Sequence, residues 1–160
     1  MIKSLEPLSC KNAVTRKPEN KTILIRVLSP FNAGYFIKEF PSLLYKEDII
    51  DILELNFSDA NPHKTGYDNA EDYINYQLKG NLGFKILFNE NMARKILNFV
   101  DEYINSVDTI WVHCVRGVYR SRAIILAINE IYKLGFDFQY YSYNTYVKDV
   151  LIKTFKKYEK

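Results

Sequence analysis

The residues best suited to chemistry stand in one ten-residue segment, Val112–Ser121, which reads VHCVRGVYRS. Cys114 follows a short apolar run, and Arg120 comes six residues later, with Gly117 between them. A loop that leads into a helix N-terminus turns backbone N–H groups inward, and with the helix dipole they form a site for a tetrahedral oxyanion. In the same field a thiol ionises near neutral pH and becomes a nucleophile. Arg120 adds a planar fork that can bind two oxygens of such an anion.

The spacing of a cysteine and an arginine alone is not specific, because Cys10 and Arg16 repeat it. The residues before Cys10, Leu5–Ser9, do not read as an apolar strand, and no glycine between the pair allows a tight turn. We therefore interpret the first pair as accidental. Around Cys114 a strand, His113, a glycine and an apolar helix occur together, a combination expected by chance roughly once in 10⁴ to 10⁵ such cysteines.

The elements that position this segment follow from hydrophobic patterning. Three strands are predicted, at Thr22–Leu28, Ile52–Phe57 and Thr109–His113. Helices are predicted at Ala70–Leu78, Asn89–Val107, Ser121–Leu134 (ended by Gly135) and Asn144–Tyr158, while Leu82–Phe88 stays open. Strands that alternate with helices indicate one α/β domain over residues 1–160, with a central, mostly parallel sheet flanked by helices. Ligands of such sheets bind beyond the carboxyl ends of the strands.

The pattern His113-Cys114-x2-Gly117-x2-Arg120-Ser121 resembles the signature of the cysteine-dependent protein tyrosine and dual-specificity phosphatase superfamily. Further matches are looser and are similar to small bacterial and phage members: Ser29-Pro30 after the first strand, Ser58-Asp59 after the second, and Asn144 followed by Val147. The resemblance covers most of the chain and implies a protein tyrosine phosphatase-like fold.

The resemblance also implies roles for individual residues. Cys114 would attack phosphorus, and Ser121 would hydrogen-bond the thiolate and assist its departure from a phosphocysteine intermediate. His113 would orient the loop and tune the thiol. The equatorial phosphate oxygens would be held by the backbone amides of Val115, Arg116, Gly117, Val118, Tyr119 and Arg120, together with the side chain of Arg120.

A general acid is needed for the leaving oxygen, and in the family a carboxylic acid on a neighbouring loop supplies it. Asp59 is our candidate because it follows a strand and its loop should emerge at the same edge as Cys114. A carboxylate in this setting is also a common turn former, so Asp68 and then Asp72 are kept as substitutes.

Two loop positions depart from the family pattern, since Arg116 and Tyr119 stand where compact residues are usual. The expected substrate is therefore a phosphate monoester, a phosphorylated protein with tyrosine or dual specificity first. One alternative is a phosphate-recognising binding module with little turnover. The other is an RNA 5′-triphosphatase of the same superfamily, the only case in which we expect a nucleic-acid partner.

Composition agrees with this interpretation and excludes others. The 160 residues carry a formal charge of +3, which is short of a nucleic-acid-binding signature. Two scattered histidines and two cysteines offer no zinc-site spacing, so we expect neither metal nor cofactor. No stretch approaches the ~20 apolar residues of a membrane span, and the first residues lack the apolar core of a signal peptide. We expect a cytoplasmic protein with two free thiols.

Overall fold

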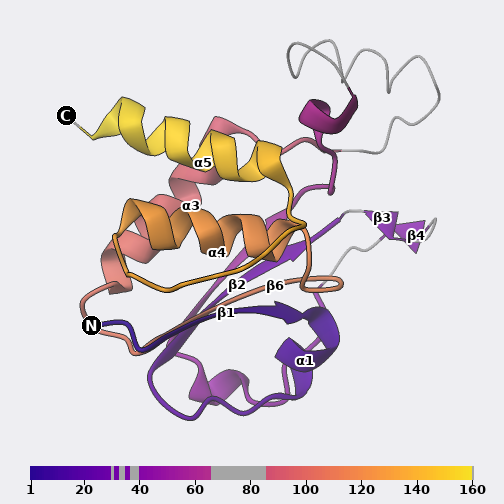
Figure 1. Ribbon diagram of the computed structural model, residues 1–160. Coiled ribbons are helices and arrows are strands. Elements are labelled where there is room, and N and C mark those ends of the chain that lie inside the picture. The colour runs from indigo at the N-terminus through magenta and orange to yellow at the C-terminus, as the bar shows by residue number, and fades with distance from the viewer. Residues whose placement is uncertain (30, 33–34, 37–39, 66–85, 160) are drawn as a thin grey trace.

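A four-stranded, all-parallel sheet forms the centre of the molecule (Figure 1). The computed structural model describes residues 1–29, 31–32, 35–36, 40–65 and 86–159. The strands are β1 (Ser4–Ser9), β2 (Thr22–Leu28), β5 (Asp51–Asn56) and β6 (Thr109–Cys114), in the order β1-β6-β2-β5. A separate antiparallel pair joins β3 (Phe31–Asn32) to β4 (Tyr35–Phe36). The prediction of an α/β fold with a mostly parallel sheet is confirmed.

Both inner strands are buried along their whole length, which explains why their sequences do not alternate between apolar and polar residues. Helices α3 (Glu90–Tyr103), α4 (Arg120–Ile131) and α5 (Thr145–Tyr158) cover one face of the sheet (Figure 1). The core on that face contains the β2 side chains Ile23, Ile25 and Val27 together with buried residues of all three helices.

The opposite face is covered by the short helix α1 (Cys10–Thr15) and by the segment around the 3-10 turn η1 (Lys46–Asp48). Leu24 and Trp111 of the inner strands pack there with Ala13 and Ile49. A second 3-10 turn, η2 (Pro62–Thr65), follows β5. Among the described helices none is long and apolar enough to cross a lipid bilayer.

Most of the predicted elements in the described ranges are present, with shifted ends. Helix α3 begins after its cap Asn89 as expected but stops at Tyr103, and α4 stops at Ile131, because Lys133 takes a left-handed conformation (φ 53°). The predicted helix at Ala70–Leu78 lies outside the described residues, as does most of Leu82–Phe88.

The segment before Cys10 corrects one expectation, because it is strand β1. Cys10 therefore does follow a strand, but it is the first residue of α1, whose side-chain cap is Ser9. Arg16 closes the other end of that six-residue helix. Since no loop separates strand from helix, this cysteine and arginine do not enclose an oxyanion-sized turn.

The strand register brings the carboxyl ends of all four strands to one edge of the sheet. Ser9 pairs with Cys114, and Leu28 pairs with Asn56. Between the two pairs, β6 and β2 are also parallel and in register. The residues that directly follow the strands are therefore brought together at this edge.

Candidate functional site: a cysteine at the carboxyl edge of the sheet

The loop of residues 115–119 connects β6 to α4 at this edge, with Cys114 as the last residue of the strand and Arg120 as the first of the helix. Gly117 has φ +75°, and a Cβ there would lie 2.6 Å from the carbonyl carbon of Leu8 in β1. The Cys10 amide donates a 3.0 Å hydrogen bond to the carbonyl oxygen of Val115. The loop is therefore shaped against the end of β1, which only glycine at position 117 permits.

The Cys114 thiol is buried, with two hydrogen-bond donors beside its sulfur. The amide of Gly117 donates to Sγ over 3.2 Å, and the Ser121 hydroxyl lies 3.3 Å from it, where it can donate to a thiolate. Burial raises the pKa of the thiol, but the Ser121 hydroxyl, the charge of Arg120 and the Gly117 amide act against it. The net result is a Cys114 pKa below the ordinary value. This is the electrostatic environment of a reactive cysteine.

The guanidinium of Arg120 is held by groups that follow two other strands. Its Nη1 donates to the hydroxyl of Ser29, after β2, over 2.9 Å and to the carbonyl oxygen of Phe57, after β5, over 2.8 Å. The side chain is almost completely buried, so these bonds fix its orientation. Within the described part of the chain, its Nε and Nη2 have no hydrogen bond and can donate to an anion.

One small cavity brings the predicted catalytic side chains together. Its volume is about 180 Å³, and it is lined by Asp59, Cys114, Val115, Arg116, Tyr119 and Arg120. Asp59 is thus placed in the same cavity as the thiol, although it stands 55 residues earlier in the chain. Its substitutes, Asp68 and Asp72, lie outside the described residues. Val118 is half-buried and is not part of the described lining.

His113 lies on the opposite face of the sheet from the thiol and is completely buried. Its Nε2 accepts a 2.9 Å hydrogen bond from Nε of Arg26, so the ring proton is on Nδ1, which lies 3.2 Å from the Cys114 carbonyl oxygen. Burial first, and then the positive charges of Arg26 and Arg120, lower the His113 pKa to about 4. The ring is therefore neutral at physiological pH and anchors the backbone of Cys114.

Several contributing residues could not be selected from the sequence. Ser29, the Phe57 carbonyl and Arg26 all contact predicted site residues, and Asn144 donates a 2.9 Å hydrogen bond to Asp59. Ser29 does carry a usable signal, because it directly follows a strand whose carboxyl end meets that of β6. Asn144 is singled out only by the resemblance to the family, and nothing local in its sequence indicates that it faces Asp59.

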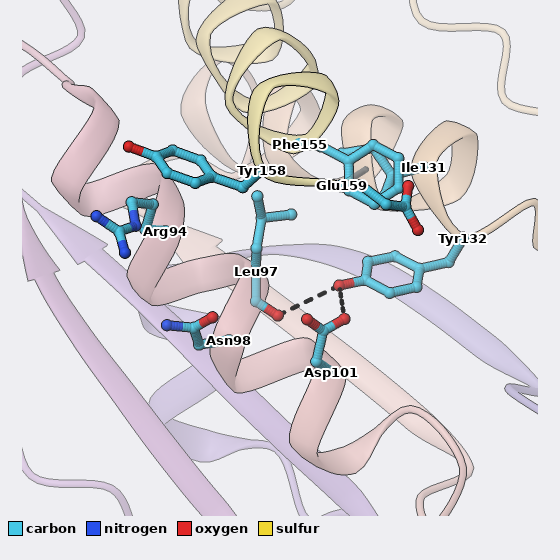
Figure 2. A pocket seen from close by; sticks show the side chains of 9 residues that line it. All are labelled: Arg94, Leu97, Asn98, Asp101, Ile131, Tyr132, Phe155, Tyr158 and Glu159. Atoms are coloured by element: carbon cyan, nitrogen blue, oxygen red, sulfur yellow. Dashed lines mark hydrogen bonds between the residues drawn. The ribbon is translucent and has the colours of Figure 1, made fainter.

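Two larger cavities lie elsewhere, and their polar groups are already paired. One of about 350 Å³ lies between α3, α4 and α5 (Figure 2). In it the hydroxyl of Tyr132 donates to the Leu97 carbonyl oxygen and to the Asp101 carboxylate, at 3.2 and 2.5 Å. Burial, followed by the bond to Asp101, raises the pKa of Tyr132. The other cavity, of about 550 Å³, is lined in part by Arg26, which is paired with His113 and Glu54.

Comparisons with known proteins add no family: the chain matches no protein-family model, and no curated protein or solved structure is found to be similar to it. Within the described ranges no cluster of three or more histidine, cysteine, aspartate or glutamate residues could hold a metal ion. The site is therefore interpreted from its own geometry. It combines an activated thiol, an oriented guanidinium and a carboxyl group around a space large enough for a phosphate.

Proposed function

We propose that the protein is a phosphatase of the cysteine-dependent protein tyrosine and dual-specificity superfamily, which hydrolyses phosphate monoesters, with phosphorylated proteins as the first substrate class. The observation that carries the proposal is the Cys114 sulfur. It accepts a hydrogen bond from the Gly117 amide and lies beside Ser121, and it shares a cavity with Arg120 and Asp59. A cysteine that was merely packed at the end of a strand would not need this set of neighbours.

In the first step, the thiolate of Cys114 attacks phosphorus, so that an S–P bond forms as the ester P–O bond breaks. The leaving oxygen takes its proton from the carboxylic acid of Asp59. The guanidinium of Arg120 and the amides of loop 115–119 stabilise the charge that spreads over the phosphoryl oxygens. The bonds from Arg120 to Ser29 and Phe57 keep that guanidinium oriented before the substrate arrives.

In the second step, a water molecule attacks phosphorus and gives a proton to the carboxylate of Asp59. The S–P bond breaks, inorganic phosphate is released, and sulfur leaves as the thiolate. The Ser121 hydroxyl, 3.3 Å from the sulfur, donates to that thiolate and makes it a better leaving group. Both steps balance without a metal or cofactor.

The fold supports the same assignment at a finer level. We propose that the four-stranded parallel sheet, with three helices on one face, is a small version of the protein tyrosine phosphatase fold. In such sheets the site lies beyond the carboxyl ends of the strands, which is where Cys114 lies. Under this proposal His113 anchors the cysteine and takes no part in proton transfer, because its ring faces away from the thiol.

The test is hydrolysis of an aryl phosphate and of a phosphotyrosyl peptide by the full chain, with vanadate as inhibitor. We expect vanadate-sensitive turnover between pH 5 and 7 that falls by roughly 10⁴-fold or more in Cys114→Ser, since the nucleophile is lost. Cys10→Ser is the matched control and should keep its activity.

Two results would replace the proposal. If the wild-type protein binds phosphate but shows no turnover, it is a binding module, and Arg116 and Tyr119 in the cavity lining are the first residues to replace with compact ones. If RNA with a 5′-triphosphate is hydrolysed much faster than phosphotyrosine, it is an RNA-end phosphatase.

A further inference from the structure

Asn144 connects three separate parts of the proposed site while being almost completely buried. Its backbone amide donates a 3.0 Å hydrogen bond to the carbonyl oxygen of Tyr119, at the end of the phosphate loop. Its side-chain Nδ2 donates to Oδ1 of Asp59 at 2.9 Å and to the carbonyl oxygen of Ala60 at 3.2 Å. Its Oδ1 accepts from the Val147 amide at 3.1 Å and so caps helix α5.

The direction of the Asn144 amide is fixed by these partners. Only an oxygen can accept from the Val147 amide, so the nitrogen must face the Asp59 carboxyl and the Ala60 carbonyl. A reversed amide would place its oxygen against two acceptors and its nitrogen against a donor. Asn144 therefore presents a donor to Asp59 in every conformation that keeps the helix cap.

We propose that Asn144 is the positioning residue for the general acid of the reaction. Its hydrogen bond occupies Oδ1 of Asp59, so the transferable proton is carried by Oδ2. Its bond to Tyr119 keeps that carboxyl in register with the phosphate loop. This inference rests on the proposed phosphatase function and assigns a residue that acts through Asp59 without touching the reacting atoms.

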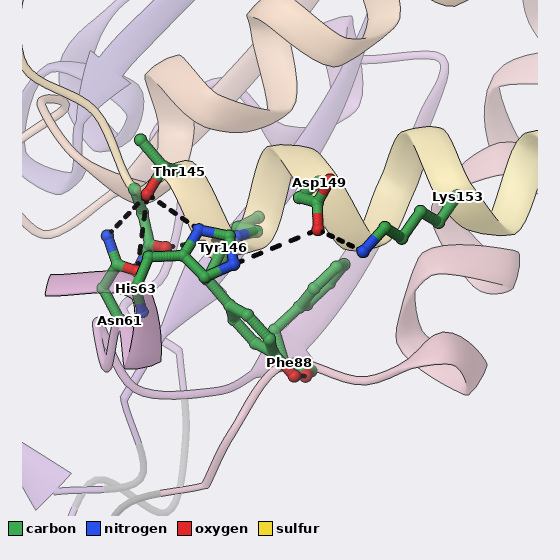
Figure 3. A network of polar contacts seen from close by, with 9 residues as sticks. Asn61, His63, Phe88, Thr145, Tyr146, Asp149 and Lys153 are labelled. Atoms are coloured by element: carbon green, nitrogen blue, oxygen red, sulfur yellow. Dashed lines mark hydrogen bonds and ion pairs between the residues drawn. The ribbon is translucent and has the colours of Figure 1, made fainter. Parts of the chain in front are cut away.

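The rest of the acid loop is attached to α5 by other residues, so loss of the Asn144 amide would not by itself release the loop. Asn61 Nδ2 donates to the Thr145 hydroxyl at 3.0 Å, and His63 Nδ1 lies 3.2 Å from the same hydroxyl (Figure 3). His63 Nε2 also lies 4.0 Å from the Asp149 carboxylate. The expected effect of changing Asn144 is therefore a misplaced carboxyl on a loop that stays docked.

The test compares Asn144→Ser with Asn89→Ser. Serine keeps the capping oxygen in both variants. Asn89 caps α3 through a 3.0 Å bond from the Met92 amide and makes no contact with the acid loop, so it controls for a weakened cap. The substrates are phenyl phosphate, a poor leaving group that needs the acid, and p-nitrophenyl phosphate, a good one that needs it less.

For Asn144→Ser we expect kcat on phenyl phosphate to fall by about 10- to 100-fold, the range of one hydrogen bond to a charged group. On p-nitrophenyl phosphate the fall should be several-fold smaller, with KM little changed on either substrate. Asn144→Asp keeps the cap but turns a carboxylate toward Asp59, so it should lose more than the serine variant. It also provides the second variant should Asn144→Ser fold poorly, with folding of all variants followed by thermal unfolding.

The outcomes separate this inference from the proposed function. An inactive wild-type protein overturns both. An active wild type in which Asn144→Ser and Asn144→Asp lose the same factor on both substrates, or no more than Asn89→Ser loses, overturns the role of Asn144 alone. A loss confined to KM does the same, because it would indicate a binding defect and not a misplaced acid.

Discussion

Arg26 and His113 face each other across the two central strands, and Nε of the arginine donates to Nε2 of the histidine over 2.9 Å. Both side chains are buried, and Nη2 of Arg26 also donates to the carbonyl oxygen of Pro41 over 2.7 Å. A protonated His113 could not accept this bond and would place a second cation against the guanidinium. The pair is therefore stable only while the imidazole is neutral.

The first prediction concerns stability at low pH. Burial and the nearby cations lower the His113 pKa from an ordinary value of 6.5 to about 4. Between these pH values the unfolded chain binds a proton that the folded chain does not, so stability is full above pH 6.5 and is lost as the pH falls toward 4. The contribution of His113 amounts to about 3 kcal/mol.

Urea unfolding at pH 7, 6, 5 and 4.5 measures this contribution. Compared with wild type, His113→Gln should start from a lower free energy of unfolding at pH 7 and lose less of it on acidification. Parallel pH dependences for the two proteins would show that His113 is not the group responsible.

The second prediction compares two glycines with left-handed conformations. Gly135 has φ +80°, and a Cβ added there would meet no atom within 4 Å, so Gly135→Ala should cost only the conformational strain, roughly 1–2 kcal/mol. Gly117→Ala adds the 2.6 Å contact with the Leu8 carbonyl carbon and should cost about 1–3 kcal/mol more.

Urea unfolding gives both values, and aryl phosphate hydrolysis should be impaired only in Gly117→Ala, because the loop must move away from β1. Equal costs for the two variants would mean that the loop adapts to a Cβ without strain.

The third prediction concerns the two thiols. Burial raises the pKa of Cys10, whereas the neighbours of Cys114 lower its pKa despite its greater burial. Exposure alone would favour alkylation of Cys10 first. We expect iodoacetamide at pH 6.5 to modify Cys114 roughly tenfold faster, because the thiolate is the reacting form.

Peptide mass spectrometry over time measures both rates. The preference for Cys114 should narrow as the pH rises and Cys10 ionises, and inorganic phosphate should protect Cys114 alone. Faster labelling of Cys10 at pH 6.5 would contradict an activated Cys114.

The fourth prediction tests the acid. Asp59→Asn should lower kcat by roughly 10² or more on phenyl phosphate, because the leaving oxygen no longer receives a proton. The control is Asp108→Asn, which removes a carboxylate that pairs with Lys3 at 3.5 Å, outside the cavity. If Asp59→Asn keeps the wild-type rate, the role passes to Asp68 or Asp72.

The sequence predicted the elements whose signal is local. Strand β2 is an unbroken apolar run, and α3 and α5 carry helical periodicity behind asparagine caps. Strand β1 was missed because it contains Pro7, and its buried residues Leu5 and Leu8 are three apart instead of two. As an edge strand that pairs only with β6, it tolerates the missing amide of the proline.

The same division holds for the candidate site. Cys114, Arg120 and Ser121 were predicted because they lie together in one segment, and the sheet register then placed Asp59 in the same cavity. The partners of those residues could not be predicted. The bond between Arg120 and Ser29 joins residues 91 positions apart, and that between Asn144 and Asp59 joins residues 85 apart. Such contacts depend on the packed fold and leave no periodic trace in the sequence.

The bond from the Cys10 amide to the Val115 carbonyl makes the end of β1 a reporter of what happens in the loop. An anion that rigidifies loop 115–119 should slow hydrogen exchange at the Cys10 amide, although Cys10 itself would never touch the anion. Occupancy of the site can then be followed at an amide of the amino-terminal region, without a label on any residue that performs the chemistry.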